Sequence, residues 1–148
     1  MNQSIYSIFE TTVEIVSLGL TFLGAFKMNR KYFLSGICLI SILPIMGETS
    51  AFLVSHEALS LLTAGIFVAQ LILSFPSNIS YNSENAAASV LSVKISLAML
   101  IINLVQGYII LTLRTTVDAQ HGYAHILIGV ALIYLIIKRY TTKGLYWK

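Results

Sequence analysis

Charged residues are scarce in this 148-residue chain, and their scarcity sets its class. Asp, Glu, Lys and Arg make up 10% of the residues, whereas 57% are hydrophobic and the mean hydropathy is +0.83. An average soluble domain has roughly 25% charged residues. A chain of this length cannot bury so much apolar surface and still present a polar exterior to water. The composition therefore excludes a soluble globular domain, and it also excludes a disordered chain.

The chain has a single cysteine and none of the common enzyme motifs. The single Cys38 excludes an intrachain disulfide and a Cys-based metal cluster. The sequence has no P-loop, no dinucleotide-binding fingerprint and no Gly-x-Ser-x-Gly. No Lys or Arg precedes Lys27, so the basic start of a secretory signal peptide is missing. We therefore expect the first apolar stretch to be a retained membrane span.

Apolar stretches separated by short polar segments predict a polytopic helical membrane protein. One membrane-spanning helix takes about 20 apolar residues, so the chain has room for about five. Polar and turn-forming residues divide the sequence accordingly, with one break at the triplet Ser55-His56-Glu57. We predict one all-α membrane domain over residues 1–148, with spans at about 5–26, 32–54, 57–75, 87–113 and 121–137.

The basic residues predict the orientation of these spans. Seven of the nine Lys and Arg residues form two clusters, which are Lys27, Arg30 and Lys31, and Lys138, Arg139, Lys143 and Lys148. The positive-inside rule places both clusters on the cytoplasmic side. An odd number of spans then puts the N-terminus outside and the C-terminus in the cytoplasm. The 76–86 loop would be cytoplasmic without any Lys or Arg, with Lys94 able to extend towards that side.

Glu10 and Glu14 are the first candidates for proton or ion binding. They lie one helical turn apart, and Ser17 and Thr21 continue the same face. Charged groups in hydrocarbon are costly, so they usually face the interior of a bundle and mark a functional site. Two neighbouring carboxylates suit a shared proton or a cation. The alternative for Glu14 is a structural hydrogen bond between helices.

Glu48 is the second acidic candidate because Pro44 and Gly47 precede it. Proline removes a backbone hydrogen bond, and glycine loosens the helical turn. Freed carbonyls beside a carboxylate are typical of the broken-helix ion sites of transporters. The alternative is an ordinary proline within a membrane helix.

Three histidines are candidate cofactor ligands. His121 and His125 lie one helical turn apart, and His56 opens the third span. Two imidazoles from facing helices can hold a b-type haem. Imidazole together with the carboxylate of Glu14 or Glu48 would instead suit copper, zinc or iron. The third interpretation is that these histidines lie at the membrane interface, hydrogen-bonded and without a ligand.

Two amide side chains lie near the middle of the fourth span. Asn103 and Gln106 are polar residues in an otherwise apolar segment. Such amides usually hydrogen-bond one helix to another. The alternative is contact with a quinone headgroup.

The spacing of histidine and acidic residues resembles that of the compact b-haem four-helix membrane proteins, such as the small archaeal form of haem A synthase. Asp118 stands three residues before His121, and His56 lies at the outer end of another helix. The resemblance covers roughly residues 33–137, and it implies His56 with His121 or His125 as haem ligands. The longer outer loops of that family are missing and the first span is extra. We take from the resemblance a haem- or quinone-associated membrane subunit, without the enzyme activity.

Two functional hypotheses follow. The first is a small, non-catalytic subunit of a respiratory or other electron-transfer complex in a prokaryotic cell membrane. It would pack against larger membrane subunits and shape a haem b or quinone site, or serve only as a structural accessory subunit. The second is a small proton- or cation-coupled transporter or channel that uses Glu14 and Glu48. A metal-dependent membrane enzyme would use the same residues. No soluble basic face is present for nucleic acid.

Overall fold

The computed structural model describes residues 3–75, 86–113 and 117–141, which form five α-helices without a strand. Their bounds are α1 Gln3–Lys27, α2 Arg30–Ser55, α3 Ala58–Ser74, α4 Ala86–Thr112 and α5 Ala119–Thr141. These helices agree with the five predicted apolar segments to within a few residues. The predicted all-helical class is therefore confirmed.

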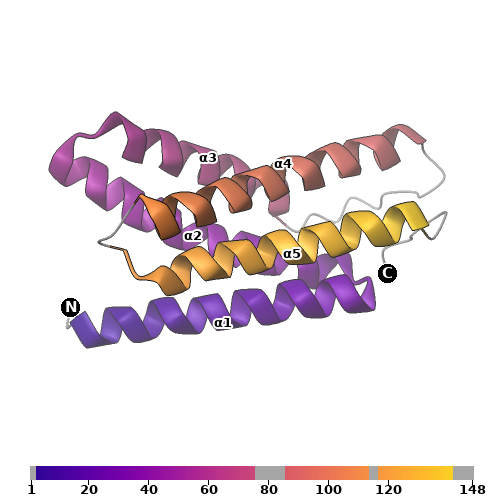
Figure 1. Ribbon diagram of the computed structural model, residues 1–148, viewed down its shortest axis with the longest axis horizontal. Helices are drawn as coiled ribbons and strands as arrows, with labels where there is room; N and C mark the ends of the chain where they lie inside the picture. Colours follow the sequence, from indigo (N-terminus) through magenta and orange to yellow (C-terminus); the bar gives the residue numbers. More distant parts are fainter. Residues whose placement is uncertain (1–2, 76–85, 114–116, 142–148) are drawn as a thin grey trace.

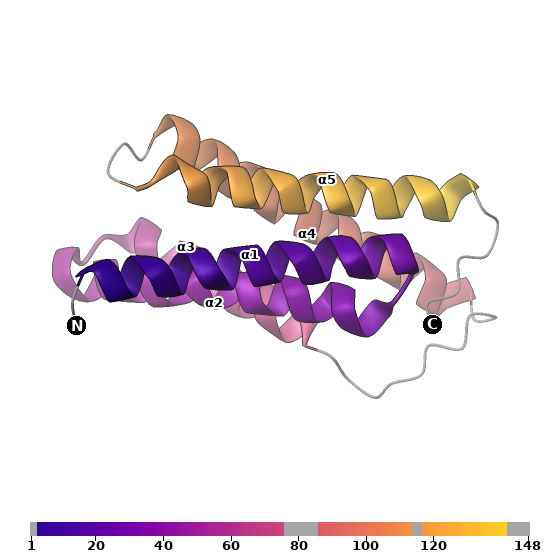
Figure 2. The same cartoon turned by 90° about the horizontal axis from the view of Figure 1, so that it is seen from below.

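The helices lie in two layers (Figures 1 and 2). Helices α1, α2 and α3 form one layer, and the antiparallel α4–α5 pair forms the other. Within the layers α1 packs on α2, α2 on α3, and α4 on α5, whereas contact between the layers runs mainly from α1 to α5. Helices α3 and α4 approach each other closely at only a few backbone positions.

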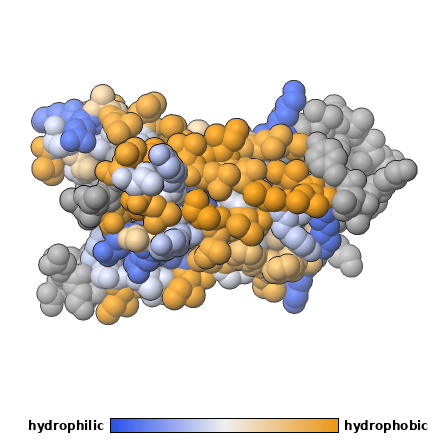
Figure 3. Space-filling model, in the orientation of Figure 1, coloured by the Kyte–Doolittle hydropathy of each residue, from blue (hydrophilic) through white to orange (hydrophobic). Residues whose placement is uncertain are grey.

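The outer surface of the bundle has the character of a membrane protein. Four segments are long and apolar enough to cross a membrane, namely Tyr6–Lys27, Arg30–Ser55, Val93–Thr112 and Ala119–Lys138. Helix α3 is apolar but has only 17 residues. Large apolar side chains such as Val54 and Ile72 are strongly exposed, and Figure 3 shows hydrophobic residues across the middle of one face. An exposed apolar surface of this extent fits lipid contact, so the protein is membrane-embedded.

Small residues bring α1 and α2 into close contact. Ser17 and Thr21 are fully buried, and Gly36 of α2 lies against them. A Cβ atom on Gly36 would be 2.2 Å from Thr21 Oγ1 and 2.6 Å from the Ser17 carbonyl oxygen. Small residues at such crossings let helix backbones approach each other. Of the predicted polar stripe, Glu14, Ser17 and Thr21 are buried in the bundle, whereas Glu10 is half-buried.

The break between α2 and α3 lies at the predicted triplet. Helix α2 ends at Ser55, and the backbone of His56 turns into the left-handed region with φ 57°. The His56 N–H donates to the Phe52 carbonyl oxygen at 2.8 Å, which caps the helix. This turn ends α2 and directs α3 back along it, and the His56 side chain is exposed.

The hydrophobic core joins the two layers in the half of the bundle near Lys27 and Lys138. Its buried residues come from α1, α2, α4 and α5, and they are Ala25, Phe33, Ile37, Ile40, Met99, Ile128, Leu132 and Leu135. In the opposite half of the bundle the same four helices present many polar residues. The two layers therefore pack through apolar side chains at one end of the bundle, and polar side chains lie between them at the other end.

Candidate functional site

A cavity of about 690 Å³ lies between the layers, in the half of the bundle where α1 begins and α2 ends. Its lining on α2 extends from Ile40 to Ser55, and Glu57 and Val117 line it next to the helix ends. The cavity therefore reaches this end of the bundle. It is lined by Glu10, Glu14, Ile40, Leu43, Pro44, Gly47, Glu48, Ala51, Val54, Ser55, Glu57, Ser60, Gln106, Ile110, Leu113, Val117, His121 and His125.

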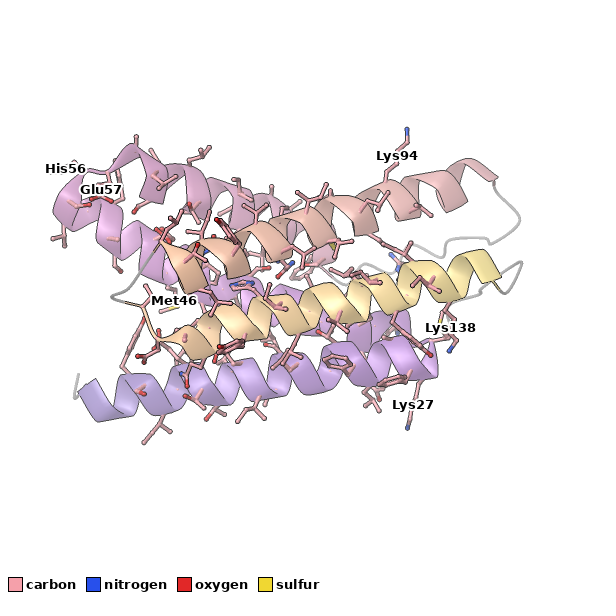
Figure 4. All side chains as sticks on the ribbon, viewed as in Figure 1. Lys27, Met46, His56, Glu57, Lys94 and Lys138 are labelled. Carbon is pink, nitrogen blue, oxygen red and sulfur yellow. The ribbon has the colours of Figure 1, made fainter. Side chains whose placement is uncertain are left out.

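We call this space the acidic cavity because its lining includes four carboxylates, those of Glu10, Glu14, Glu48 and Glu57, and no Lys or Arg of the described residues. The labelled lysines Lys27, Lys94 and Lys138 lie at the other end of the molecule from Glu57 (Figure 4). Charge is thus separated along the bundle axis. A concave space lined by one sign of charge concentrates ions of the opposite sign, so the acidic cavity favours cations.

Glu14 connects the two layers at the wall of the acidic cavity. Its carboxylate is buried, and its Oε1 atom pairs with Nδ1 of His121 on α5. The alternative of a structural bond between helices is therefore confirmed for Glu14. Glu14 also lines the cavity, and its proton or ion binding stays a prediction. Glu10, one turn nearer the end of α1, is half-buried and lines the cavity too.

Glu48 lies on the α2 wall of the acidic cavity and is 5% exposed. The broken helix predicted beside it is wrong, because α2 continues without interruption through Pro44 and Gly47. A membrane helix tolerates proline when surrounding groups satisfy the freed backbone. An added Cβ on Gly47 would meet nothing within 4 Å. The wall beside Glu48 is therefore open and not tightly packed.

A chain of hydrogen bonds crosses the bundle at the inner end of the acidic cavity. We call Ser41, Gln70, Asn103 and His125 the polar chain; they come from α2, α3, α4 and α5. Gln70 Nε2 donates to Ser41 Oγ at 3.0 Å, and Asn103 Nδ2 donates to Gln70 Oε1 at 2.9 Å. Asn103 Oδ1 lies 2.9 Å from Nδ1 of His125. One continuous set of polar contacts thus links both layers below the cavity.

The direction of these bonds assigns a role to each ring nitrogen of His125. Asn103 uses its amide nitrogen towards Gln70 and the Met99 carbonyl, at 2.9 and 2.8 Å, so its oxygen accepts from His125. The hydrogen of the neutral ring therefore lies on Nδ1, and Nε2 is the acceptor. The ring also packs on Phe67, with ring centroids 5.3 Å apart. His125 is thus fixed in orientation where it lines the cavity.

The sequence revealed only part of the polar chain. The prediction that Asn103 bonds one helix to another is confirmed. Gln70 and Ser41 were not predicted, although both are fully buried. Gln70 is the one amide in the apolar segment of α3. Such a residue within an apolar span is itself a signal for a buried polar contact.

The histidines are not arranged as a pair of axial haem ligands. His56 is exposed, stacks edge-on with Phe52 and does not line the acidic cavity. His121 and His125 share one face of α5, so they cannot approach a flat macrocycle from opposite sides. The described residues also contain no group of three or more His, Cys, Asp or Glu placed to hold a metal ion. The haem and metal assignments stay predictions that this geometry does not favour.

Some predicted features fall outside the described residues. They are residues 76–85 of the polar loop, Arg114, Lys143 and Lys148. Comparison of the chain with protein-family models, curated proteins and solved structures finds no match. The resemblance to the b-haem four-helix proteins therefore stays a prediction, and the function is argued from the site alone.

Proposed function

We propose that the protein crosses the membrane five times, with its basic end in the cytoplasm and the acidic cavity facing the outside. The positive-inside rule supports this, because Lys27, Lys94 and Lys138 lie at the same end (Figure 4). The 17 residues of α3 extend about 25 Å at about 1.5 Å per residue. That length is slightly less than a hydrocarbon core of about 30 Å, a mismatch that local thinning of the bilayer accommodates.

The function that the site supports best is cation transport, with the acidic cavity as the binding site and Glu14 and Glu48 as the cation-binding residues. The observation that carries this proposal is the set of four carboxylates lining one cavity without a lysine or arginine from the described residues. Two of the four, Glu14 and Glu48, are buried. Carboxylates inside a membrane bundle usually serve ion or proton pathways.

The contact between Glu14 and His121 gives this proposal a mechanism. It joins α1 of one layer to α5 of the other. A cation or proton that binds Glu14 competes with His121 for the same carboxylate, so occupancy of the cavity weakens a contact between the layers. A shift of one layer against the other would also have to accommodate the polar chain, which joins α3 to α4 through Gln70 and Asn103. Movement of one helix group against another around a fixed site is how many transporters alternate their access.

Replacement of Glu14 by Gln tests the transport proposal. We expect the wild-type chain in proteoliposomes to carry proton, Na⁺ or K⁺ current driven by a pH gradient or a membrane potential. Glu14→Gln removes the charge while keeping the shape, and should lower that flux by at least about tenfold. Asp118→Asn is the matched control, because Asp118 lies at the same end of the bundle but does not line the cavity. Flux equal to that of empty liposomes, or unchanged by Glu14→Gln, would overturn the proposal.

A quinone-associated subunit of an electron-transfer complex is the second candidate function. It draws on Gln106 and His125, which line the inner end of the cavity beside apolar Ile40 and Ile110. Amide and imidazole groups beside apolar walls suit a quinone headgroup and its tail. Gentle purification separates the two candidates. This second function would be favoured if larger subunits and an extractable quinone copurify with the chain, and if Gln106→Leu loses the quinone. A b-type band in a reduced-minus-oxidised spectrum would favour a haem-carrying form.

A further inference from the structure

Three uncharged polar groups line the acidic cavity beside its carboxylates. The Gln106 side chain is 7% exposed, and the Ser60 side chain is 2% exposed. The third group is Nε2 of His125, whose other ring nitrogen is held by Asn103. Polar groups at the wall of a cavity can hydrogen-bond an occupant that has polar atoms of its own.

Gln106 and His125 are complementary to one kind of polar group. The Gln106 amide offers both N–H donors and a carbonyl acceptor, whereas Nε2 of His125 only accepts. A hydroxyl group can donate to His125 and accept from Gln106 at the same time. These residues thus fit a ligand hydroxyl better than a second charge.

The size and walls of the acidic cavity suit an occupant larger than a bare ion. A volume of about 690 Å³ lies in the range of about 300–1,000 Å³ typical of small-molecule sites. Much of the lining is apolar, contributed by Ile40, Leu43, Pro44, Ala51, Val54, Ile110, Leu113 and Val117. A metal ion or proton would contact the carboxylates and leave these walls and Gln106 unused. An occupant with an apolar body would contact both.

We infer that the acidic cavity binds an organic monocation with an apolar body and a hydroxyl group at the end remote from the charge. This inference rests on the proposed cation-transport function and names its substrate class. The ammonium group lies among the carboxylates, with Glu14 and Glu48 as its main partners. The apolar body packs on Ile40 and Ile110, and the hydroxyl bonds Gln106 and Nε2 of His125. A hydroxylated aryl-alkylammonium has this pattern.

Binding of three matched probes to the detergent-solubilised full chain tests the inference. The probes are tyramine, phenethylamine, which lacks the hydroxyl, and 3-phenylpropionate, which reverses the charge. At neutral pH, titration calorimetry should show tyramine binding about tenfold more tightly than phenethylamine, because of its additional hydrogen bonds. 3-Phenylpropionate should not bind. Equal affinities of the two amines would refute the role given to Gln106 and His125.

Variants of the chain separate the contribution of the ligand's charge to binding from that of its hydroxyl group. Gln106→Leu should remove the difference between the two amines, and Glu48→Gln should weaken both amines by at least about tenfold. The matched controls Gln120→Leu and Asp118→Asn lie outside the cavity and should retain wild-type affinities. If Gln106→Leu does not fold, Ala51→Trp, which fills the cavity, should abolish binding of both amines. Unchanged binding in Ala51→Trp would overturn the inference.

The outcomes distinguish this inference from the function on which it rests. If neither amine binds although proteoliposomes show a Glu14-dependent flux of inorganic cations, the organic substrate class is wrong and cation transport stands. If both binding and flux are absent, both proposals fail. Amine binding that Glu48→Gln weakens, together with amine uptake into proteoliposomes, would establish both.

Discussion

Replacing Gly36 by alanine is expected to lower the free energy of unfolding by about 2–3 kcal/mol. The added Cβ would lie 2.2 Å from Thr21 Oγ1, and 2.6 Å from both the Ser17 carbonyl oxygen and the Thr21 backbone nitrogen. Two of these three neighbours are backbone atoms, which cannot rotate away. Helices α1 and α2 must therefore move apart, which weakens the layer that carries Glu14 and Glu48.

Gly47→Ala on the same helix is the matched control. An added Cβ at Gly47 meets nothing within 4 Å, so alanine should stabilise the helix by up to about 1 kcal/mol through its higher helix propensity. Unfolding of the detergent-solubilised protein by increasing SDS measures both variants. A Gly36→Ala variant as stable as Gly47→Ala would show that α1 and α2 do not meet at Gly36.

Replacing Asn103 by leucine is expected to cost about 2–3 kcal/mol, because it leaves two buried groups without partners. Gln70 Oε1 loses its donor, and Nδ1–H of His125 loses its acceptor. Single hydrogen bonds between membrane helices average less than about 1 kcal/mol, so a loss of this size requires that both bonds depend on one residue. The same change releases His125 from its fixed orientation at the cavity.

A double-mutant cycle tests whether the polar chain acts as one unit. Gln70→Leu together with Asn103→Leu should cost less than the sum of the two single changes, with a coupling of about 0.5–1.5 kcal/mol. Gln120→Leu, at an exposed amide whose partner is Thr11 at 3.4 Å, should change stability by less than about 0.5 kcal/mol. Additive effects of the Gln70 and Asn103 changes would mean that the two side chains do not interact.

The helices and the inward polar faces could be predicted from the sequence because their signals are local. The break at Ser55-His56-Glu57 interrupts an apolar run, and it coincides with the left-handed turn at His56. The inward stripe on α1 follows from helical periodicity, which places Glu14, Ser17 and Thr21 on one face. Each of these features depends only on residues a few positions apart in the chain.

The partners across the bundle could not be predicted, because they depend on how the helices rotate and pack. Glu14 and His121 are 107 positions apart, and Gln70 and Asn103 are 33 apart. The sequence indicated that several of these residues face the interior, but not which of them meet. The same limit applies to the predicted role of His56 as a cofactor ligand. Its spacing resembled that of a cofactor ligand, whereas its position at a helix cap exposes it to the surroundings.

The accessibility of the acidic cavity to cations from the outside is the central claim, and cysteine labelling measures it directly. Cys38 is the single cysteine, so Ala51→Cys in a Cys38→Ala background places one thiol at the cavity wall. Two membrane-impermeant methanethiosulfonates, one trimethylammonium and one sulfonate, are added to intact cells. We expect the cationic reagent to react at least about tenfold faster, because four carboxylates line its path. Equal rates for both reagents, or labelling only from the cytoplasmic side, would contradict the proposal.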